Sequence, residues 1–248
     1  MPSNYDILAE IHDEIGIGDF AERMTSRLLD YAQRNDWMGR QIAVLGSGSS
    51  ESIRWLAQHS YVVTGVEQSQ RMLELTQSAL DTAGVSAQLI LADFRAVTFL
   101  PHDMVLSLDT LSELSNIRDL ERVLKHIHGL VKAQGLFIFD MYTIEGLVKR
   151  NQDGYALEHD ADGLTIFAGN DIDYERSIQY RKYIIFREQG AGWERQEAER
   201  RLRAYPVQGV TALVKRCGFE VHSVLREDMR TYDMNESAQR VIVVARKP

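Results

Sequence analysis

The sequence predicts an α/β protein with a doubly wound sheet and a shorter antiparallel β segment inserted toward its carboxyl-terminal end. Two observations carry this prediction. Five short apolar runs alternate with helical stretches between residues 42 and 139, and continuous apolar strands are typical of a parallel sheet covered on both faces. From residue 164 the pattern changes to longer alternating runs broken by a Gly-Ala-Gly turn, which favours antiparallel strands.

Residues 1–40 precede the first apolar run and form a predicted N-terminal helical cap. Apolar side chains recur at intervals of three and four through residues 5–35, as they do in amphipathic helices. Gly16 and Gly18 interrupt this pattern, so we expect the helical structure to break there.

Five predicted strands follow, and each apolar run stops at a glycine or an acidic residue. The runs cover residues 42–45, 61–66, 88–92, 104–108 and 136–139. The residues that end them are Gly46, Glu67, Asp93, Asp109 and Asp140. Helical periodicity over residues 50–59, 69–83 and 117–132 separates the strands. Because strands joined in this way run parallel, their carboxyl ends meet at one edge of the sheet, where such sheets bind ligands.

The remaining predicted elements divide into an inserted sheet and the end of the core. Residues 164–205 form the antiparallel β segment, and the core comprises residues 41–163 and 206–248. A helix over residues 207–216 and two strands over 219–225 and 240–246 complete that core.

Composition and charge exclude several classes of function. The 248 residues include 28 lysines and arginines against 36 acidic residues, and the formal charge of −8 argues against broad nucleic-acid binding. The single cysteine, Cys217, excludes an internal disulfide and a cysteine-rich zinc site, which fits a cytoplasmic location. We expect no membrane span or signal peptide, because no long apolar stretch is present. We expect no metal site, because His126 and His128 point to different faces of a predicted helix.

The first strand leads into a glycine turn that suits ligand binding. Gly46-Ser47-Gly48 lies between the strand and a helix, where the backbone can approach a ligand and the helix N-terminus offers free N–H groups. Glu67 follows 21 residues after Gly46, and an acidic residue at this strand end can accept both hydroxyls of a ribose. Asp93 ends the third strand, where its carboxylate could receive an adenine amino group. The sequence therefore predicts a nucleoside-binding crevice.

These motifs resemble those of class I S-adenosylmethionine-dependent methyltransferases. The stretches that carry the resemblance are residues 42–48, 66–73, 92–95, 109–111 and 130–140. Tyr5-Asp6-x-x-Ala9 is similar to the small-molecule branch, which includes sugar N,N-dimethyltransferases and glycine or sarcosine methyltransferases. The resemblance implies a Rossmann-like, doubly wound seven-stranded sheet with its last strand antiparallel. It also implies that the antiparallel segment is a lid over the acceptor pocket.

The resemblance further implies S-adenosylmethionine as cofactor and S-adenosylhomocysteine as product. The residues that it assigns to cofactor binding are Gly46, Ser47, Gly48, Glu67, Gln68, Met72, Asp93, Phe94, Leu108, Asp109 and Thr110. Two positions depart from the family pattern. Val44 stands where an acidic residue is usual, and Ser50 stands where a third glycine is usual. These departures keep a second hypothesis open, namely a non-catalytic or regulatory protein that kept the fold and lost turnover.

A dinucleotide-dependent oxidoreductase is a third hypothesis, and the sequence disfavours it. Its third glycine should fall at position 51, which is Glu51. The reversed final strand pair is also unexpected for that class of enzyme.

The activity that the resemblance implies is methyl transfer to a small-molecule acceptor, a reaction of the EC 2.1.1 type. The sulfonium leaving group is already activated, so the protein mainly aligns a nitrogen or oxygen nucleophile for in-line displacement. The candidate catalytic residues are Asp109, Tyr5 and His12. The candidate substrate-binding residues are Tyr142, Tyr174, Tyr180, Arg201 and Tyr205, with Arg201 as a contact for an anionic acceptor. A homodimer contact could form through the exposed antiparallel segment.

Overall fold

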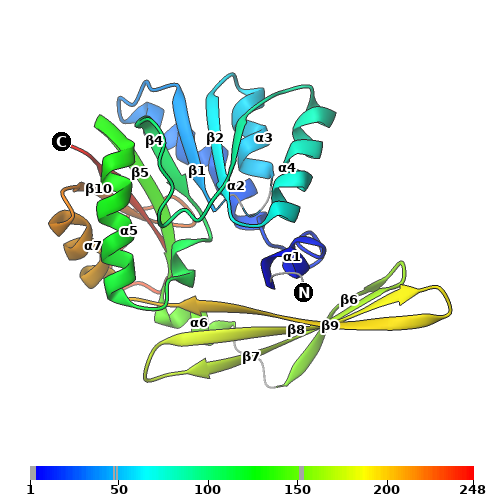
Figure 1. Cartoon of the computed structure of the whole chain (residues 1–248). Helices are drawn as coiled ribbons and strands as arrows, with labels where there is room; N and C mark the ends of the chain where they lie inside the picture. Colours follow the sequence, from blue (N-terminus) through cyan, green and yellow to red (C-terminus); the bar gives the residue numbers. More distant parts are fainter. Residues whose placement is uncertain (1–3, 47, 49, 151–153) are drawn as a thin grey trace.

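A seven-stranded mixed sheet forms the core of the protein, and a separate four-stranded antiparallel sheet lies along one end of it (Figure 1). The computed structural model describes residues 4–46, 48, 50–150 and 154–248. The seven strands of the core are β1 (Gln41–Leu45), β2 (Val62–Glu67), β3 (Gln88–Leu91), β4 (His102–Ser107), β5 (Val131–Tyr142), β10 (Glu220–Arg226) and β11 (Arg240–Arg246).

The order of the core strands is β10-β11-β5-β4-β1-β2-β3. Strands β1 to β5 pair in parallel, whereas β11 is antiparallel to both β5 and β10. The predicted doubly wound sheet with its last strand antiparallel is therefore confirmed. This order brings the carboxyl ends of β1, β2 and β4 together, because β1 lies between the other two.

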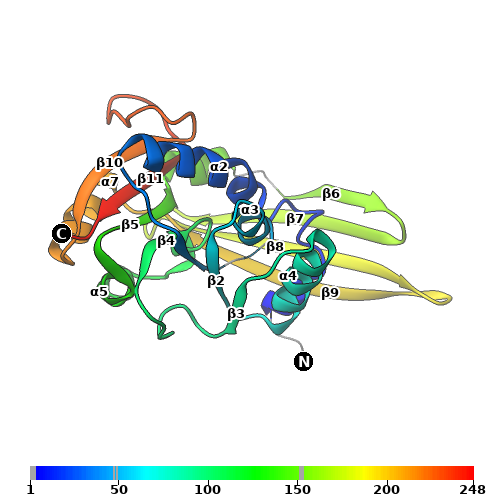
Figure 2. The same cartoon turned by 90° about the horizontal axis from the view of Figure 1, so that it is seen from above.

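Helices cover both faces of the core sheet (Figure 2). The helices of the described residues are α1 (Asn4–Ala9), α2 (Asp19–Arg34), α3 (Glu51–Gln58), α4 (Gln70–Ala83), η1 (Leu111–Glu113), α5 (Ile117–Leu130), α6 (Ile144–Lys149) and α7 (Val207–Arg216). Ile42 and Val44 of β1 pack with α2 and α3, while Ala43 and Leu45 pack with α5 and α7. Successive residues of a strand point to opposite faces, so a strand buried on both faces is apolar throughout.

The four-stranded sheet is a chain of hairpins in the order β6-β7-β8-β9. Its strands are β6 (Tyr155–Ala161), β7 (Leu164–Asp173), β8 (Ile178–Gln189) and β9 (Gly192–Arg203). The predicted Gly-Ala-Gly turn joins β8 to β9, since Gln189 pairs with Gly192. Leu8 of α1 and Ile11 pack on one face of this sheet, against Ile166 and Ile185. The amino-terminal helix thus lies between the two sheets (Figure 1).

Three elements of the structure have no counterpart in the sequence prediction, and one of them, η1, is a single turn of three residues. Strand β6 is an edge strand with no buried residue, so its sequence lacks the alternation that marks a strand. Helix α6 has six residues, too few to show a helical period. Among the described residues, no helix is long and apolar enough to cross a membrane, and no three His, Cys, Asp or Glu side chains are grouped to hold a metal ion.

Helix α6 packs so closely on the chain before β11 that its glycine cannot be enlarged. A Cβ at Gly146 would lie 2.0 Å from the carbonyl oxygen of Gln239 and 2.7 Å from its carbonyl carbon. We expect Gly146→Ala to lower the free energy of unfolding by roughly 1–3 kcal/mol, because backbone atoms cannot yield as a flexible side chain can. Urea denaturation measures the change. Gly129→Ala is the matched control, since a Cβ there meets nothing within 4 Å and should leave stability equal or higher.

Candidate functional site

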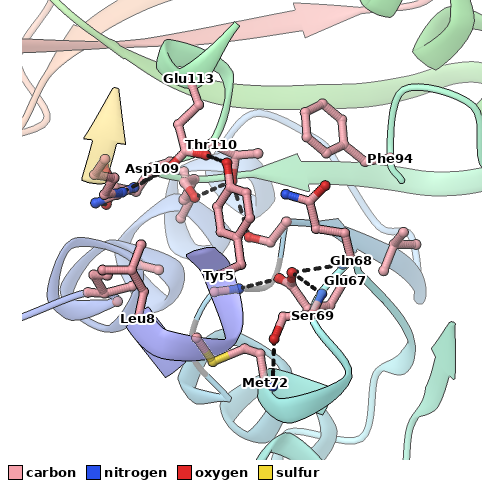
Figure 3. A pocket seen from close by; sticks show the side chains of 18 of the residues that line it. Tyr5, Leu8, Glu67, Gln68, Ser69, Met72, Phe94, Asp109, Thr110 and Glu113 are labelled. Carbon is pink, nitrogen blue, oxygen red and sulfur yellow. Dashed lines mark hydrogen bonds and ion pairs between the residues drawn. The ribbon is translucent and has the colours of Figure 1, made fainter. Parts of the chain in front are cut away.

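A cavity opens at the carboxyl ends of β1, β2 and β4, where the sequence predicted a crevice (Figure 3). We call it the strand-end cavity. Of the residues predicted to bind the cofactor, those that line it are Gly46, Gly48, Glu67, Gln68, Met72, Phe94, Leu108, Asp109 and Thr110. Ser47 lies outside the described residues. The sequence did not single out several further lining residues, namely Leu8, Ile17, Gly18, Ala21, Val66, Ser69, Ala92, Glu113 and Arg200.

The glycine turn after β1 is fixed by backbone contacts and by one threonine. Gly46 has φ of 63°, and a Cβ there would lie 2.4 Å from Cγ2 of Thr110. Only glycine fits both the left-handed backbone and this close approach. The Thr110 hydroxyl lies 3.1 Å from the Gly46 carbonyl oxygen and 2.9 Å from that of Leu108, and the Gly46 amide donates to the carbonyl of Val66.

Glu67 connects this turn to the start of α4. Its side chain is 6% exposed and accepts hydrogen bonds from the amides of Gly48 (3.1 Å), Gln68 (2.8 Å) and Ser69 (3.1 Å). Burial raises the pKa of Glu67, although the three amides act in the opposite direction. A carboxylate has about four acceptor positions, so capacity remains for a hydroxyl in the cavity.

Asp93 lies outside the cavity wall, although its neighbours Ala92 and Phe94 line it. Its carboxylate accepts from the guanidinium of Arg95, with the Nε atom 2.8 Å from each oxygen. These hydrogen bonds lower the pKa of Asp93. In this arrangement the Asp93 carboxylate binds Arg95 and does not line the cavity.

Asp109 is a buried carboxylate held between two arginines. Its Oδ2 lies 3.0 Å from Nη1 of Arg200, and its Oδ1 lies 2.5 Å from Nη2 of Arg240. Its amide donates to Oδ1 of Asp140 at 2.6 Å, and its φ of 55° is in the left-handed region. Burial alone would raise the pKa of Asp109, but the two guanidinium groups outweigh it and hold the pKa well below its usual range. Burial dominates at Asp140 and raises its pKa to about 6, against the opposing charge of Arg240.

A second network ties helix α1 to the four-stranded sheet. Arg200 of β9 donates from Nε to Oε1 of Glu113 at 2.8 Å, and the Tyr5 hydroxyl donates to the other oxygen of Glu113 at 2.6 Å. Figure 3 shows Tyr5 directed at Glu113 across the cavity. Burial and the neighbouring Glu113 carboxylate raise the pKa of Tyr5, so its phenol is protonated at neutral pH.

A second cavity, which we call the arginine-rich cavity, meets the strand-end cavity at a common wall. Asp109 and Arg200 line both cavities. The other residues that line the second cavity are Ile15, Gly16, Asp19, Phe20, Arg23, Tyr142, Arg150, Glu158, Arg181, Tyr183, Glu227, Gln239 and Arg240. Five of its lining residues are therefore arginines, supplied by α2, the end of α6, β8, β9 and β11.

The structure brings only part of the predicted acceptor site to this cavity. Tyr142 lines it, Asp109 lines both cavities, and Tyr5 lines only the strand-end cavity. The predicted residues that line neither cavity are His12, Tyr174, Tyr180, Arg201 and Tyr205. His12 is bound within its own loop, where its Nδ1 lies 2.8 Å from the carbonyl of Ala9.

The side chains of Tyr174, Tyr180 and Tyr205 are engaged elsewhere or exposed. Tyr174 is 65% exposed, and the Tyr205 hydroxyl donates to the Leu114 carbonyl at 2.9 Å. Tyr180 stacks against the guanidinium of Arg201, 5.5 Å from the ring centre.

The prediction at Arg201 missed the cavity by one residue. Along β9, Ala198, Arg200 and Leu202 are buried, whereas Glu199 and Arg201 are exposed. Since strand side chains alternate between faces, a shift of one residue exchanges the cavity face for the outer face. The apolar side chains at 198 and 202 were the signal that could have identified Arg200 as the inward residue.

Comparisons with known proteins agree with this architecture. Residues 44–139 match the model of a family described as a methyltransferase domain. The chain is 26% identical over 216 residues to YqeM of Bacillus subtilis, provisionally named as a methyltransferase, with 84% of each chain covered. It is similar to the structure of an S-adenosylmethionine-dependent methyltransferase from Clostridium acetobutylicum, with 16% identity, a TM-score of 0.82 and 99% of each chain covered. It is also similar to the sugar N-methyltransferase KedS8 from Streptoalloteichus, with 15% identity, a TM-score of 0.72, and 100% of this chain and 94% of that chain covered.

Proposed function

The segment from residue 44 to residue 139 is a class I S-adenosylmethionine-dependent methyltransferase domain, and from this premise we propose that the protein methylates a nitrogen or oxygen atom of a small molecule. One observation carries the proposal: the strand-end cavity and the arginine-rich cavity meet at Asp109 and Arg200. A donor in the first cavity and an acceptor in the second would react at that common wall. Two ligands held in line in this way need little further chemistry from the protein.

The residues of the strand-end cavity fit S-adenosylmethionine. Glu67 keeps acceptor capacity for ribose hydroxyls, and Met72 and Phe94 offer apolar surface to the adenine. Gly46 has no side chain, so the backbone of the turn can approach the ligand closely. When bound, S-adenosylmethionine supplies a methyl group on an activated sulfonium.

The residues around the common wall align the acceptor and keep water out. Asp109 stays ionised at neutral pH, because the two arginines lower its pKa. The Asp109 carboxylate therefore accepts a hydrogen bond from an N–H or O–H group of the substrate and orients the nucleophile. Because its pKa is low, Asp109 is a weak base. Tyr5 and Leu8 of α1 line the strand-end cavity and close it. We assign no role to His12, which lines neither cavity.

Amines are the first acceptors to test. A neutral amine attacks without a strong base, which suits a site whose carboxylate has a low pKa. The likeness of the fold to the sugar N-methyltransferase KedS8 supports the same choice.

A non-catalytic relative is the second candidate, and the departures at Val44 and Ser50 favour it. Val44 is 4% exposed within the core, so no carboxylate anchors the glycine turn from that position. The side chain of Ser50 forms no capping hydrogen bond at the start of α3.

Calorimetric titration of S-adenosylmethionine and S-adenosylhomocysteine separates the two candidates. We expect micromolar dissociation constants, about −8 kcal/mol of binding free energy. Release of S-adenosylhomocysteine with a panel of small amines and alcohols then tests turnover. Absence of binding at millimolar ligand would reject the proposed activity and favour the non-catalytic candidate.

A further inference from the structure

Most of the arginines in the arginine-rich cavity are neutralised by carboxylates of the protein itself. Arg200 and Arg240 share Asp109 between them. Arg181 pairs with Glu158, with its Nη2 atom 2.6 Å from the carboxylate oxygen. These three guanidinium groups form ion pairs within the cavity wall, so the carboxylates of the protein already balance their charge.

Arg150 differs from them, because it has no carboxylate partner among the residues that the structure describes. Its Nη1 atom donates to the Tyr142 hydroxyl at 2.6 Å, and its guanidinium lies 5.2 Å from the centre of the Tyr142 ring. Arg240 donates to the same hydroxyl and lies 3.9 Å from the same ring. Two cations therefore converge on one phenol, and burial raises the pKa of Tyr142 so that it stays neutral. Asp109 and Asp140 form ion pairs with Arg240, whereas Arg150 forms none in the described part of the chain and interacts with Asp109 only through its longer-range charge.

The backbone at Arg150 is fixed by the four-stranded sheet. Asn170 of β7 donates from Nδ2 to the Arg150 carbonyl at 2.7 Å. The side-chain oxygen of Asn170 in turn accepts from Arg181 at 3.3 Å. A guanidinium held at both its backbone and its Tyr142 contact is pre-organised, and its planar fork matches the two oxygens of a carboxylate or phosphate.

Other charges in the cavity limit where an anion can bind. The carboxylates of Asp19 and Glu227 line the cavity and form no ion pair among the described residues, and Arg23 is exposed on helix α2. These carboxylates disfavour an anion beside them and favour a cationic or hydrogen-bond-donating part of a ligand. The neighbourhood of Arg150 is the part of the wall that suits an oxyanion.

We infer that the methyl acceptor carries an oxyanion, a carboxylate or a phosphate, that binds the guanidinium of Arg150. Its nucleophile then reaches Asp109, which is separated from Arg150 by the Tyr142 hydroxyl and the Arg240 guanidinium. This inference rests on the proposed function, since it assigns a substrate class to the same site. It replaces Arg201, on the outer face of β9, as the contact for an anionic acceptor.

A binding experiment tests the subsite without knowledge of the acceptor. Inorganic phosphate and benzoate are titrated separately into protein saturated with S-adenosylhomocysteine, with chloride holding the ionic strength constant. We expect at least one anion to bind, and Arg150→Gln to weaken that binding about fivefold or more. Lys149→Gln is the matched control, because Lys149 is the adjacent cation, pairs with Glu145 and does not line the cavity. The anion whose affinity falls in Arg150→Gln identifies the recognised group, a carboxylate for benzoate and a phosphate for inorganic phosphate.

A turnover experiment uses matched acceptors with and without the charge. Glucosamine 6-phosphate is compared with glucosamine, and 4-aminobenzoate with aniline. We expect the charged member of one pair to be preferred about tenfold or more in kcat/KM, and Arg150→Gln to raise its KM by a similar factor with kcat nearly unchanged. Thermal denaturation of each variant detects separately any folding defect caused by loss of the hydrogen bond from Arg150 to Tyr142.

The outcomes distinguish this inference from the proposed function. If S-adenosylhomocysteine does not bind the unaltered protein, the proposed function fails. If it binds but Arg150→Gln and Lys149→Gln bind both anions equally well, the oxyanion subsite is rejected while the proposed function stands. Equal methylation of charged and neutral acceptors would reject the subsite in the same way.

Discussion

Glu67→Ala is expected to weaken S-adenosylhomocysteine binding about tenfold or more, a loss of at least about 1.4 kcal/mol. The buried carboxylate accepts from the amides of Gly48, Gln68 and Ser69, so its removal leaves both the glycine turn and the start of α4 without an anchor. It also removes the acceptor proposed for the ribose hydroxyls. Isothermal titration calorimetry measures the dissociation constant directly.

Glu74→Ala is the control for this experiment. Glu74 lies on α4, the helix that follows Glu67, but its side chain is 51% exposed and contacts only groups on the helix surface, Gln70 at 3.1 Å and Arg71 at 3.3 Å among the described residues. Its replacement should leave the dissociation constant unchanged, because exposed ion pairs contribute little. Equal affinity of the Glu67 and Glu74 variants for the ligand would show that the cofactor does not use this strand end.

Asp109→Ala is expected to cause the largest loss of stability, about 3–5 kcal/mol. The variant leaves Arg200 and Arg240 buried, with 10% and 6% of their side chains exposed, and removes the carboxylate that they share. Arg200 keeps Glu113 and Arg240 keeps Asp140, so each guanidinium loses one of its two carboxylates, and such a loss costs far more in a buried site than at the surface. The midpoint of urea denaturation measures the change, and Asp228→Ala, at an exposed ion pair with Arg230, should show almost none.

The effect of Asp109 should depend on pH in a definite direction. Its pKa in the folded protein lies below the value of an unfolded aspartate, about 3.9. The folded state therefore binds fewer protons here, and the carboxylate contributes stability above about pH 4 that is lost as the pH falls through its folded pKa. The difference in unfolding free energy between the unaltered protein and Asp109→Asn should shrink below pH 4. A difference that grows on acidification would contradict the ion-pair assignment.

The strand-end cavity could be predicted from the sequence because strand ends mark it. Gly46, Glu67 and Asp109 each follow a continuous apolar run, and parallel strands bring such positions to one edge of the sheet. Asp93 also follows a continuous apolar run, but its carboxylate binds Arg95 two residues away. The strand-end pattern does not predict this contact. Position along the chain thus located the cavity, while side-chain pairing decided which residue lines it.

The arginine-rich cavity could not be predicted in the same way, because it depends on contacts distant in sequence. Asp109 is held by Arg200, which lies 91 residues further along the chain, and by Arg240, which lies 131 residues further. Neither arginine belongs to a recognisable motif. The choice between Arg200 and Arg201 depends on the pleat of β9, which a mixed run of charges conceals.

The place of β11 inside the sheet has a consequence for how the protein is made. It is the last of the strands along the chain, yet it lies between β5 and β10 rather than at an edge. While the chain emerges from the ribosome, β5 and β10 present unpaired edges, and Asp109 lacks the guanidinium of Arg240. Sheet closure and the pairing of Arg240 with Asp109 and Asp140 therefore both wait for the synthesis of β11. A delay at that step would leave open strand edges, which are sites of aggregation, after all the other strands of the core sheet have been made.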